Sequence, residues 1–220
     1  MQFRTFKSQI TKISSAELGG IEVQLLLAPS YRKRMEWEWA NVENSIKAAV
    51  LILFFPDPNG EIRFLLTKRA TYKGHHSNQI SFPGGKKDKN DNTLLETALR
   101  ETKEEVGIEI TKKQIIKQLT DVYIPPSNFV VTPFLGILDK TPVFNLNYEV
   151  EITITPTLSQ LLDDTTLKTS SVTTTKGETI QTPSFVFNSE IVWGATAMML
   201  SELKKVCELV LMQNKKNRGQ

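Results

Sequence analysis

The stretch GGKKDKNDNTLLETALRETKEEVG, residues 84–107, decides how this sequence is interpreted. From Thr93 to Val106 the apolar residues recur every three or four positions, at Leu94, Leu95, Ala98, Leu99 and Val106. This period is typical of an amphipathic helix, and Gly107 stands where many helices end on a left-handed glycine. The sequence therefore predicts a helix over residues 93–106.

Three carboxylates lie along one edge of this predicted helix. Glu101 and Glu105 are four positions apart and Glu104 is three from Glu101, so the three side chains can converge. Oxygen ligands of this kind suit Mg²⁺ or Mn²⁺, which can neutralise charge on phosphoryl oxygens. Gly84 and Gly85 would let the backbone approach a phosphate substrate closely. Taken alone, however, such an acidic run is more commonly a solvated helix face.

The charge balance changes sign near residue 90. Residues 60–90 carry seven basic and two acidic side chains, whereas residues 91–106 carry five acidic and two basic ones. A basic approach to an acidic pocket suits a metal–polyphosphate complex. Lys68 and Arg69, at the end of a predicted strand, are the candidates for contacting a diphosphate or a further phosphate.

The segments on either side predict a mixture of strands and helices. Residues 48–55 form a short apolar run that ends at a Pro- and Gly-rich turn, which indicates a buried strand with residues 62–67 as its hairpin partner. Further strands are expected at 79–82, 129–138, 149–154, 172–175 and 184–188, and a long amphipathic helix at 193–212. The order predicts one α/β or α+β domain over residues 41–220. Residues 1–40 are expected to form an N-terminal arm packed on it, with an aromatic cluster at Trp37 and Trp39.

Composition sets outer limits on the function. With 220 residues, 40% of them hydrophobic and 23% charged, the chain is neither disordered, fibrous nor a disulfide scaffold. A net charge of +3 is too small to indicate nucleic-acid binding. The longest apolar run, residues 48–55, is far below the roughly 20 residues of a membrane span, and no secretory signal is visible. The single cysteine, Cys207, fits a reducing compartment, so a cytoplasmic protein without membrane or nucleic-acid partners is expected.

The acidic helix and the glycines before it resemble a known motif, the Nudix box. Gly85, five residues, Asp91, eight residues and then the run RETKEEVGI at 100–108 correspond to its order of glycine, acid, Arg-Glu, Glu-Glu and glycine. Three departures stand out: Asp91 replaces a glutamate, one extra residue precedes the Arg-Glu pair, and Thr102 replaces a hydrophobic residue. The extra residue and the acidic pair Asp88 and Asp91 resemble the form that this motif takes in the coenzyme A branch of the family.

That branch has a second signature upstream, which this chain matches at both ends. The run LLTKRA at 65–70 and FPGG at 82–85 stand at the right separation. Between them, Gly74 and Asn78 replace the usual arginine and glycine. The resemblance covers residues 47–200.

The resemblance implies a fold and a set of roles. The fold is a Nudix-type α/β/α sandwich with a mixed sheet, preceded by the helical arm. Glu101 and Glu105 would bind Mg²⁺ or Mn²⁺, Glu104 would be a third ligand or the group that activates water, and Arg100 would orient the glutamates. The expected substrate contacts are Lys68, Arg69, Gly84 and Gly85.

The implied activity is hydrolysis of the diphosphate of coenzyme A or its derivatives, giving 4′-phosphopantetheine and adenosine 3′,5′-bisphosphate. One alternative is a hydrolase of ADP-ribose or dinucleotides. Another is a module that binds a nucleotide without cleaving it, against which the intact Arg100-Glu101 and Glu104-Glu105 pairs argue. The protein would act on small nucleotides as a monomer or homodimer.

Other polar residues receive simpler interpretations. Asp88 and Asp91 are expected to cap the start of the helix, since acids are favoured there. His75 and His76 lack partners at zinc-ligand spacing, so a zinc site is not expected.

Glu149 and Glu151, on a downstream strand, are further candidates for a general base. Glu96, on the predicted helix itself, is interpreted as solvated surface.

Overall fold

The computed structural model describes residues 1–30, 32, 42–70, 79–174 and 177–216, with side chains described as far as residue 211. The cluster of Trp37 and Trp39, His75, His76, Gly74 and Asn78 all lie outside the described residues. The expected boundary between the N-terminal arm and the domain, at residues 40 and 41, also lies outside the described residues.

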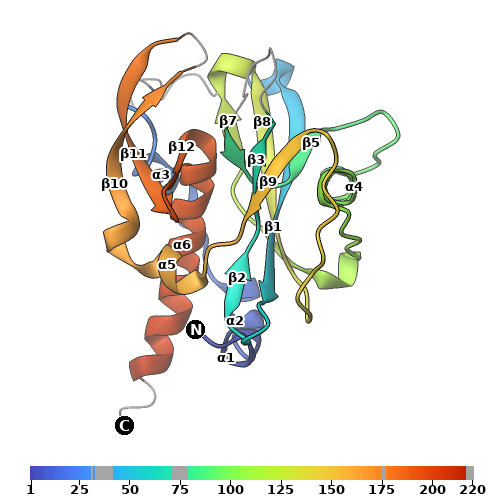
Figure 1. The fold of residues 1–220 in the computed structure, drawn as a ribbon, viewed down its shortest axis with the longest axis vertical. Coiled ribbons are helices and arrows are strands. Elements are labelled where there is room, and N and C mark those ends of the chain that lie inside the picture. Colours follow the sequence, from blue (N-terminus) through green and yellow to red (C-terminus); the bar gives the residue numbers. More distant parts are fainter. Residues whose placement is uncertain (31, 33–41, 71–78, 175–176, 217–220) are drawn as a thin grey trace.

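A mixed sheet of six strands forms the centre of the fold (Figure 1). In order across the sheet its strands are β2 (Ile62–Phe64), β1 (Ile46–Pro56), β8 (Phe129–Ile137) and β6 (Ile115–Gln118), with β5 (Gly84–Lys86) paired to β1 and β7 (Val122–Ile124) paired to β8. β1 runs parallel to β8 and antiparallel to β2 and β5. Because β1 is covered on both faces, it is a continuous apolar run rather than an alternating one.

The two faces of β1 contact different helices. Leu51 and Leu53 pack with Ala98 and Val106 of α4 (Leu94–Val106), whereas the alternate residues, such as Ile52, belong to the core on the other side. That second core includes α6 (Gly194–Lys216), and Figure 1 shows α4 and α6 on opposite sides of the sheet. The predicted mixed α/β fold is therefore confirmed.

Two smaller sheets complete the domain. One has the order β4-β3-β9 and the other β10-β11-β12. Their strands are β3 (Leu66–Arg69), β4 (Ile80–Ser81), β9 (Val150–Ile154), β10 (Leu167–Thr173), β11 (Thr179–Phe187) and β12 (Glu190–Trp193). The short helices between strands are α5 (Leu158–Leu162) and the 3₁₀ turns Lys112–Gln114, Pro125–Ser127 and Asp164–Thr166.

The predicted hairpin over residues 62–67 is wrong in its second half. β2 pairs with β1 only as far as Phe64, and β3 then pairs with β4 and β9 in another sheet. Leu65 and Leu66, where the chain passes from the first sheet to the second, are both fully buried. A continuous apolar run shows that a strand is buried but not which sheet it joins, so the sequence pattern could not reveal the change.

The N-terminal segment shares the core of the domain. It forms α1 (Phe3–Lys7), α2 (Ile10–Ser15) and α3 (Gly20–Leu25). The Phe6 ring lies 4.7 Å from that of Phe54 on β1, centroid to centroid. On α6 the fully buried Glu202 carboxylate accepts hydrogen bonds from the backbone N–H of Gly20 and from the Gln24 side chain, which joins α3 to α6.

Within the described residues, none of the helices combines the length and the apolar character needed to cross a bilayer.

Candidate active site

Helix α4 begins and ends as its sequence predicts. The Thr93 hydroxyl caps the N-terminus by accepting a hydrogen bond from the backbone N–H of Glu96 (3.2 Å). Gly107 adopts φ +72° and its N–H bonds the carbonyl of Lys103. The amphipathic period thus placed the helix correctly to within one residue.

Asp91 anchors the loop before α4 instead of capping the helix. Its buried carboxylate accepts hydrogen bonds from Arg100 Nε (3.1 Å) and Nη2 (2.9 Å), and from the Thr97 hydroxyl (2.9 Å). The hydrogen bonds from Arg100 lower the pKa of Asp91 to about 2. The expected capping role of Asp88 and Asp91 is therefore wrong, because a bidentate arginine is the stronger partner and Thr93 lies closer to the free N–H groups.

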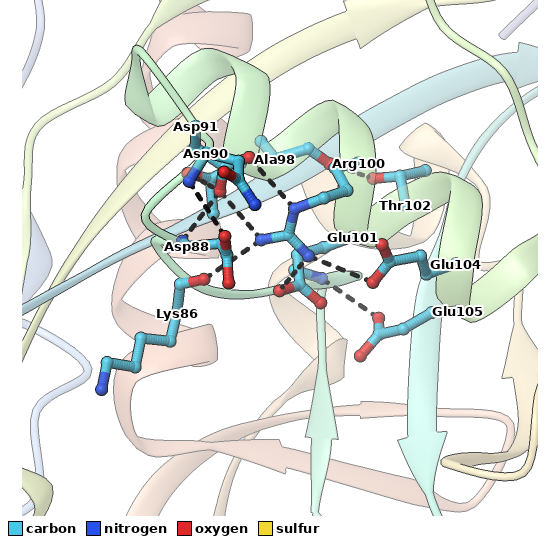
Figure 2. Close-up of polar contacts among 12 residues, drawn as sticks. Lys86, Asp88, Asn90, Asp91, Ala98, Arg100, Glu101, Thr102, Glu104 and Glu105 are labelled. Atoms are coloured by element: carbon cyan, nitrogen blue, oxygen red, sulfur yellow. Dashed lines mark hydrogen bonds and ion pairs between the residues drawn. The ribbon is translucent and has the colours of Figure 1, made fainter.

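Arg100 also contacts two of the predicted metal ligands (Figure 2). Its Nη1 donates to Glu101 Oε1 (2.9 Å) and Glu104 Oε2 (3.1 Å), and its Nη2 donates to the carbonyl of Lys86 (3.2 Å). One guanidinium therefore holds Asp91, both glutamates and the loop in a fixed arrangement. These contacts are the ones that the expected orienting role of Arg100 requires.

The two glycines of β5 allow the glutamates to approach the sheet. The N–H of Gly84 donates to Glu105 Oε2 (3.1 Å). A Cβ on Gly85 would lie 2.5 Å from the carboxyl carbon of Glu101, far inside van der Waals contact. The glycines thus make room for the carboxylates, which is a reason for them beyond the expected approach to a substrate.

Burial changes the acidity of the glutamates. The side chain of Glu105 is 6% exposed, that of Glu101 18% and that of Glu104 53%. Desolvation raises the pKa of Glu105 to about 7 and raises that of Glu101 as well. A bound cation would relieve this cost, because it would add positive charge beside both carboxylates.

The chemistry of this edge fits a divalent cation. Among the described residues, no three acidic, histidine or cysteine side chains are gathered into a ready chelate. The oxygens of Glu101, Glu104 and Glu105 are nevertheless the hard donors that Mg²⁺ and Mn²⁺ prefer. The buried and partly unpaired charge of Glu105 indicates the same kind of ligand.

The structure brings Arg69 to this edge but not Lys68. Arg69 Nη2 lies 2.8 Å from Glu149 Oε2 and its Nη1 lies 4.0 Å from Glu105 Oε1. The pairing register of β3 with β9 shifts between Lys68 and Arg69, where β9 has one additional residue, and the Lys68 ammonium pairs instead with Glu190 of β12 (3.0 Å). Adjacent strand residues point to opposite faces, so the two cations serve different sides of β3.

Of the two downstream acids, only Glu149 reaches the site. It pairs with Arg69, and its charge contributes to the raised pKa values of Glu101 and Glu105. Glu151 is exposed on β9. The sequence could not show which of Glu149 and Glu151 reaches the site, because only the pairing of β9 with β3 brings Glu149 beside Arg69.

The unusual Thr102 of the motif is accommodated inside the helix. The side chain is fully buried, and its hydroxyl donates to the carbonyl of Ala98 (2.7 Å). Since the hydroxyl is satisfied within α4, its methyl group can pack where a hydrophobic residue usually stands.

We expect Asp91→Asn to destabilise the protein by about 2–4 kcal/mol at pH 7, because it removes the buried, bidentate anionic partner of Arg100 and leaves that charge only Glu101 and Glu104. Folding lowers the pKa of Asp91 from its ordinary value of 3.8 to about 2. The Asp91 carboxylate therefore stabilises the folded protein fully at pH values above 3.8, and this stabilisation is lost as the pH falls toward about 2. The difference between wild type and variant in urea unfolding should therefore shrink between pH 7 and pH 3. Asp88→Asn is the matched control, since Asp88 is exposed and an asparagine keeps its hydrogen bond to the N–H of Asn90. Equal unfolding curves for wild type and Asp91→Asn at pH 7 would contradict the anchoring role.

Comparison with known families gives the same result as the geometry. The family model of the NUDIX domain matches residues 46–168, which contain β1, β5, α4 and the whole acidic edge. The chain belongs to the Nudix family. The matched range includes the whole segment 84–107, which resembles the Nudix box, and the mixed α/β fold is that of the family.

Curated relatives carry the same family name. An uncharacterized Nudix hydrolase NudL of Yersinia enterocolitica is 42% identical over 48% of this chain and 53% of its own length. An uncharacterized NudL of Photorhabdus laumondii is 30% identical over 73% of this chain and 84% of its own. The chain thus spans about half the length of the first relative and most of the second.

A solved structure agrees at the level of the fold. A MutT/nudix family protein from Enterococcus faecalis superposes with a TM-score of 0.52 over 81% of this chain and 67% of its own, at 18% identity.

Proposed function

We propose that this Nudix protein is a divalent-metal-dependent pyrophosphohydrolase that cleaves the diphosphate of coenzyme A or its derivatives. The observation that carries the hydrolase proposal is the carboxylate edge of α4, where Glu101 and Glu105 are drawn against the glycines of β5 by Arg100 and the N–H of Gly84. Family membership and the names of the curated relatives support it.

In this proposal the residues of the edge have separate roles. Glu101 and Glu105 hold Mg²⁺ or Mn²⁺, with Glu104 as a third ligand. The ion, when bound, neutralises charge on the phosphoryl oxygens and lowers the pKa of water. Alternatively, Glu104, the most exposed of the three, is the group that activates the attacking water by taking its proton. Arg100 keeps both Glu101 and Glu104 in position.

The bond changes are those of anhydride hydrolysis. Water oxygen adds to one phosphorus, the bond from that phosphorus to the bridging oxygen breaks, and the bridging oxygen leaves on the other phosphate. Arg69 lies beside Glu105 and keeps a buried Nε without a hydrogen-bond partner among the described residues. Among the described residues, we therefore assign Arg69 to hold the diphosphate, with Gly84 and Gly85 as further substrate contacts. Lys68, paired with Glu190, is not included.

Coenzyme A is the proposed substrate because of the sequence signatures at 65–70 and 82–85. The products would be 4′-phosphopantetheine and adenosine 3′,5′-bisphosphate. ADP-ribose and dinucleotides remain the second candidates, and the complete set of Arg100, Glu101, Glu104 and Glu105 favours both over a non-catalytic module. We also propose a cytoplasmic protein that acts on small nucleotides as a monomer or homodimer, without nucleic-acid or membrane partners.

A side-by-side measurement of kcat/KM tests the substrate. With Mg²⁺ and then Mn²⁺, coenzyme A is expected to exceed dephospho-coenzyme A by about tenfold or more, because one further charge-assisted contact contributes about 1.5–3 kcal/mol. Both should exceed ADP-ribose, and EDTA should abolish all turnover. Products identified by mass fix the bond that breaks. A higher value for ADP-ribose would transfer the proposal to the second candidate.

A further inference from the structure

The guanidinium of Arg69 lies between two carboxylates and is hydrogen-bonded to one of them. Its Nη2 donates to Glu149 Oε2 at 2.8 Å, whereas its Nη1 stays 4.0 Å from Glu105 Oε1, too far for a hydrogen bond. The Glu149 side chain is partly exposed, whereas that of Glu105 is buried. Arg69 therefore pairs with the better solvated carboxylate and stops short of the buried one.

The oxygen that Arg69 does not reach is the one that a cation would need. Glu105 Oε2 already accepts the N–H of Gly84 at 3.1 Å, and within the described residues Oε1 accepts no hydrogen bond. Oε1 is thus the atom left for the proposed cation. An approach of about 1 Å by Arg69 Nη1 would close a charge-assisted hydrogen bond to the same oxygen.

A direct pair between Arg69 and Glu105 would disable two groups at once. It would be favoured, because burial opposes the charge of Glu105 and an adjacent guanidinium would offset that cost. A cation would then have to displace the guanidinium before it could bind Oε1. The same guanidinium would no longer be free to hold a phosphate. A site that combines an anion-binding arginine with a cation-binding carboxylate therefore needs a group that keeps the two apart.

Glu149 is fixed in the place where it can do this. The N–H of Ala70, next to Arg69, donates to the Glu149 carbonyl (2.8 Å), and the N–H of Glu149 donates to Asn147 Oδ1 (2.9 Å). The N–H of Asn147 in turn donates to the carbonyl of Glu105 (3.1 Å). One short turn thus joins the end of β3 to the end of α4, and its carboxylate lies on Arg69.

We propose that Glu149 is a positioning residue that keeps Arg69 off Glu105 Oε1, so that the carboxylate stays open to a cation and the guanidinium to a phosphate. This inference rests on the proposed function, which assigns Glu105 to the cation and Arg69 to the diphosphate. It gives Glu149 a role other than that of a general base or a further metal ligand.

A double-mutant cycle followed by Mn²⁺ binding tests this role without requiring turnover. In Glu149→Ala the released Arg69 should pair with Glu105, so the Mn²⁺ affinity, measured by its paramagnetic signal, should fall about tenfold. In Arg69→Met/Glu149→Ala the competing cation is gone, so the affinity should lie within about twofold of that of Arg69→Met. Glu149→Gln should lie between the wild type and Glu149→Ala, because a neutral amide holds the guanidinium less firmly.

The background distinguishes positioning from the other roles of Glu149. A metal ligand, or a carboxylate that acts only through its charge, would lower the Mn²⁺ affinity by the same factor with and without Arg69. Equal factors would therefore overturn the proposal. An unchanged affinity in Glu149→Ala, with a lower kcat at saturating Mn²⁺, would indicate a general base and would also overturn it.

Glu151→Ala is the matched control, because Glu151 is an exposed acid two residues along the same strand. It should bind Mn²⁺ as the wild type does, and a loss equal to that of Glu149→Ala would overturn the positioning role. A wild type that cleaves no diphosphate but shows the expected coupling between Glu149 and Arg69 would overturn the hydrolase proposal and retain the positioning role.

Discussion

Glu105→Gln and Glu101→Gln are each expected to lower kcat by two or more orders of magnitude, about 3 kcal/mol in the barrier. Glutamine keeps the shape of either side chain, and at position 105 it can still accept the N–H of Gly84, but it removes an anionic ligand of the proposed cation. Stability should be retained or slightly increased, because burial already opposes the charge of both carboxylates. Turnover of coenzyme A with Mg²⁺ and thermal unfolding measure the two effects.

The matched control for these variants is Glu109→Gln. Glu109 lies just beyond α4, is exposed and, among the residues that the structure describes, pairs only with Lys103, so its replacement should change neither rate nor stability appreciably. Mn²⁺ binding, followed by its paramagnetic signal, should weaken in Glu101→Gln and Glu105→Gln and not in the control. Near-normal rates in both variants would refute the assignment of the ligands.

Gly85→Ala is expected to reduce activity by about a hundredfold while costing only about 1–2 kcal/mol of folding free energy. Its new methyl group would lie 2.5 Å from the Glu101 carboxyl carbon, and this side chain can rotate away at the expense of its position. Gly84→Ala should be worse for folding, since its methyl group would meet the backbone carbonyl of Ala49 at 2.3 Å and φ is +153°. Comparing kcat with urea unfolding in the two variants separates these effects.

A double-mutant cycle tests whether Gly85 acts through Glu101. In a Glu101→Ala background the carboxylate that the new methyl group displaces is gone, so Gly85→Ala should cause no further loss of activity. Fully additive losses would show instead that the methyl group distorts β5 or blocks the substrate directly.

Local sequence was sufficient for the elements whose residues are close along the chain. The helix α4, its glycine end and the carboxylate edge follow from a period of 3.6 residues, because side chains three and four positions apart share one face. The buried strand β1 follows from its continuous apolar run. The motif that identifies the family consists of these same short-range spacings.

Tertiary structure decided everything that depends on partners distant in the sequence. The sequence placed Lys68 and Arg69 together as phosphate ligands, but the pairing of β3 with β9 and its bulge direct only Arg69 to the site. Asp91 changed from a helix cap to the partner of Arg100 because a turn of helix carries that arginine back over the loop. The raised pKa values of Glu101 and Glu105 likewise come from burial against β5. Spacing along a chain fixes which face a side chain occupies, whereas its partners and its solvation are fixed only when separate segments pack together.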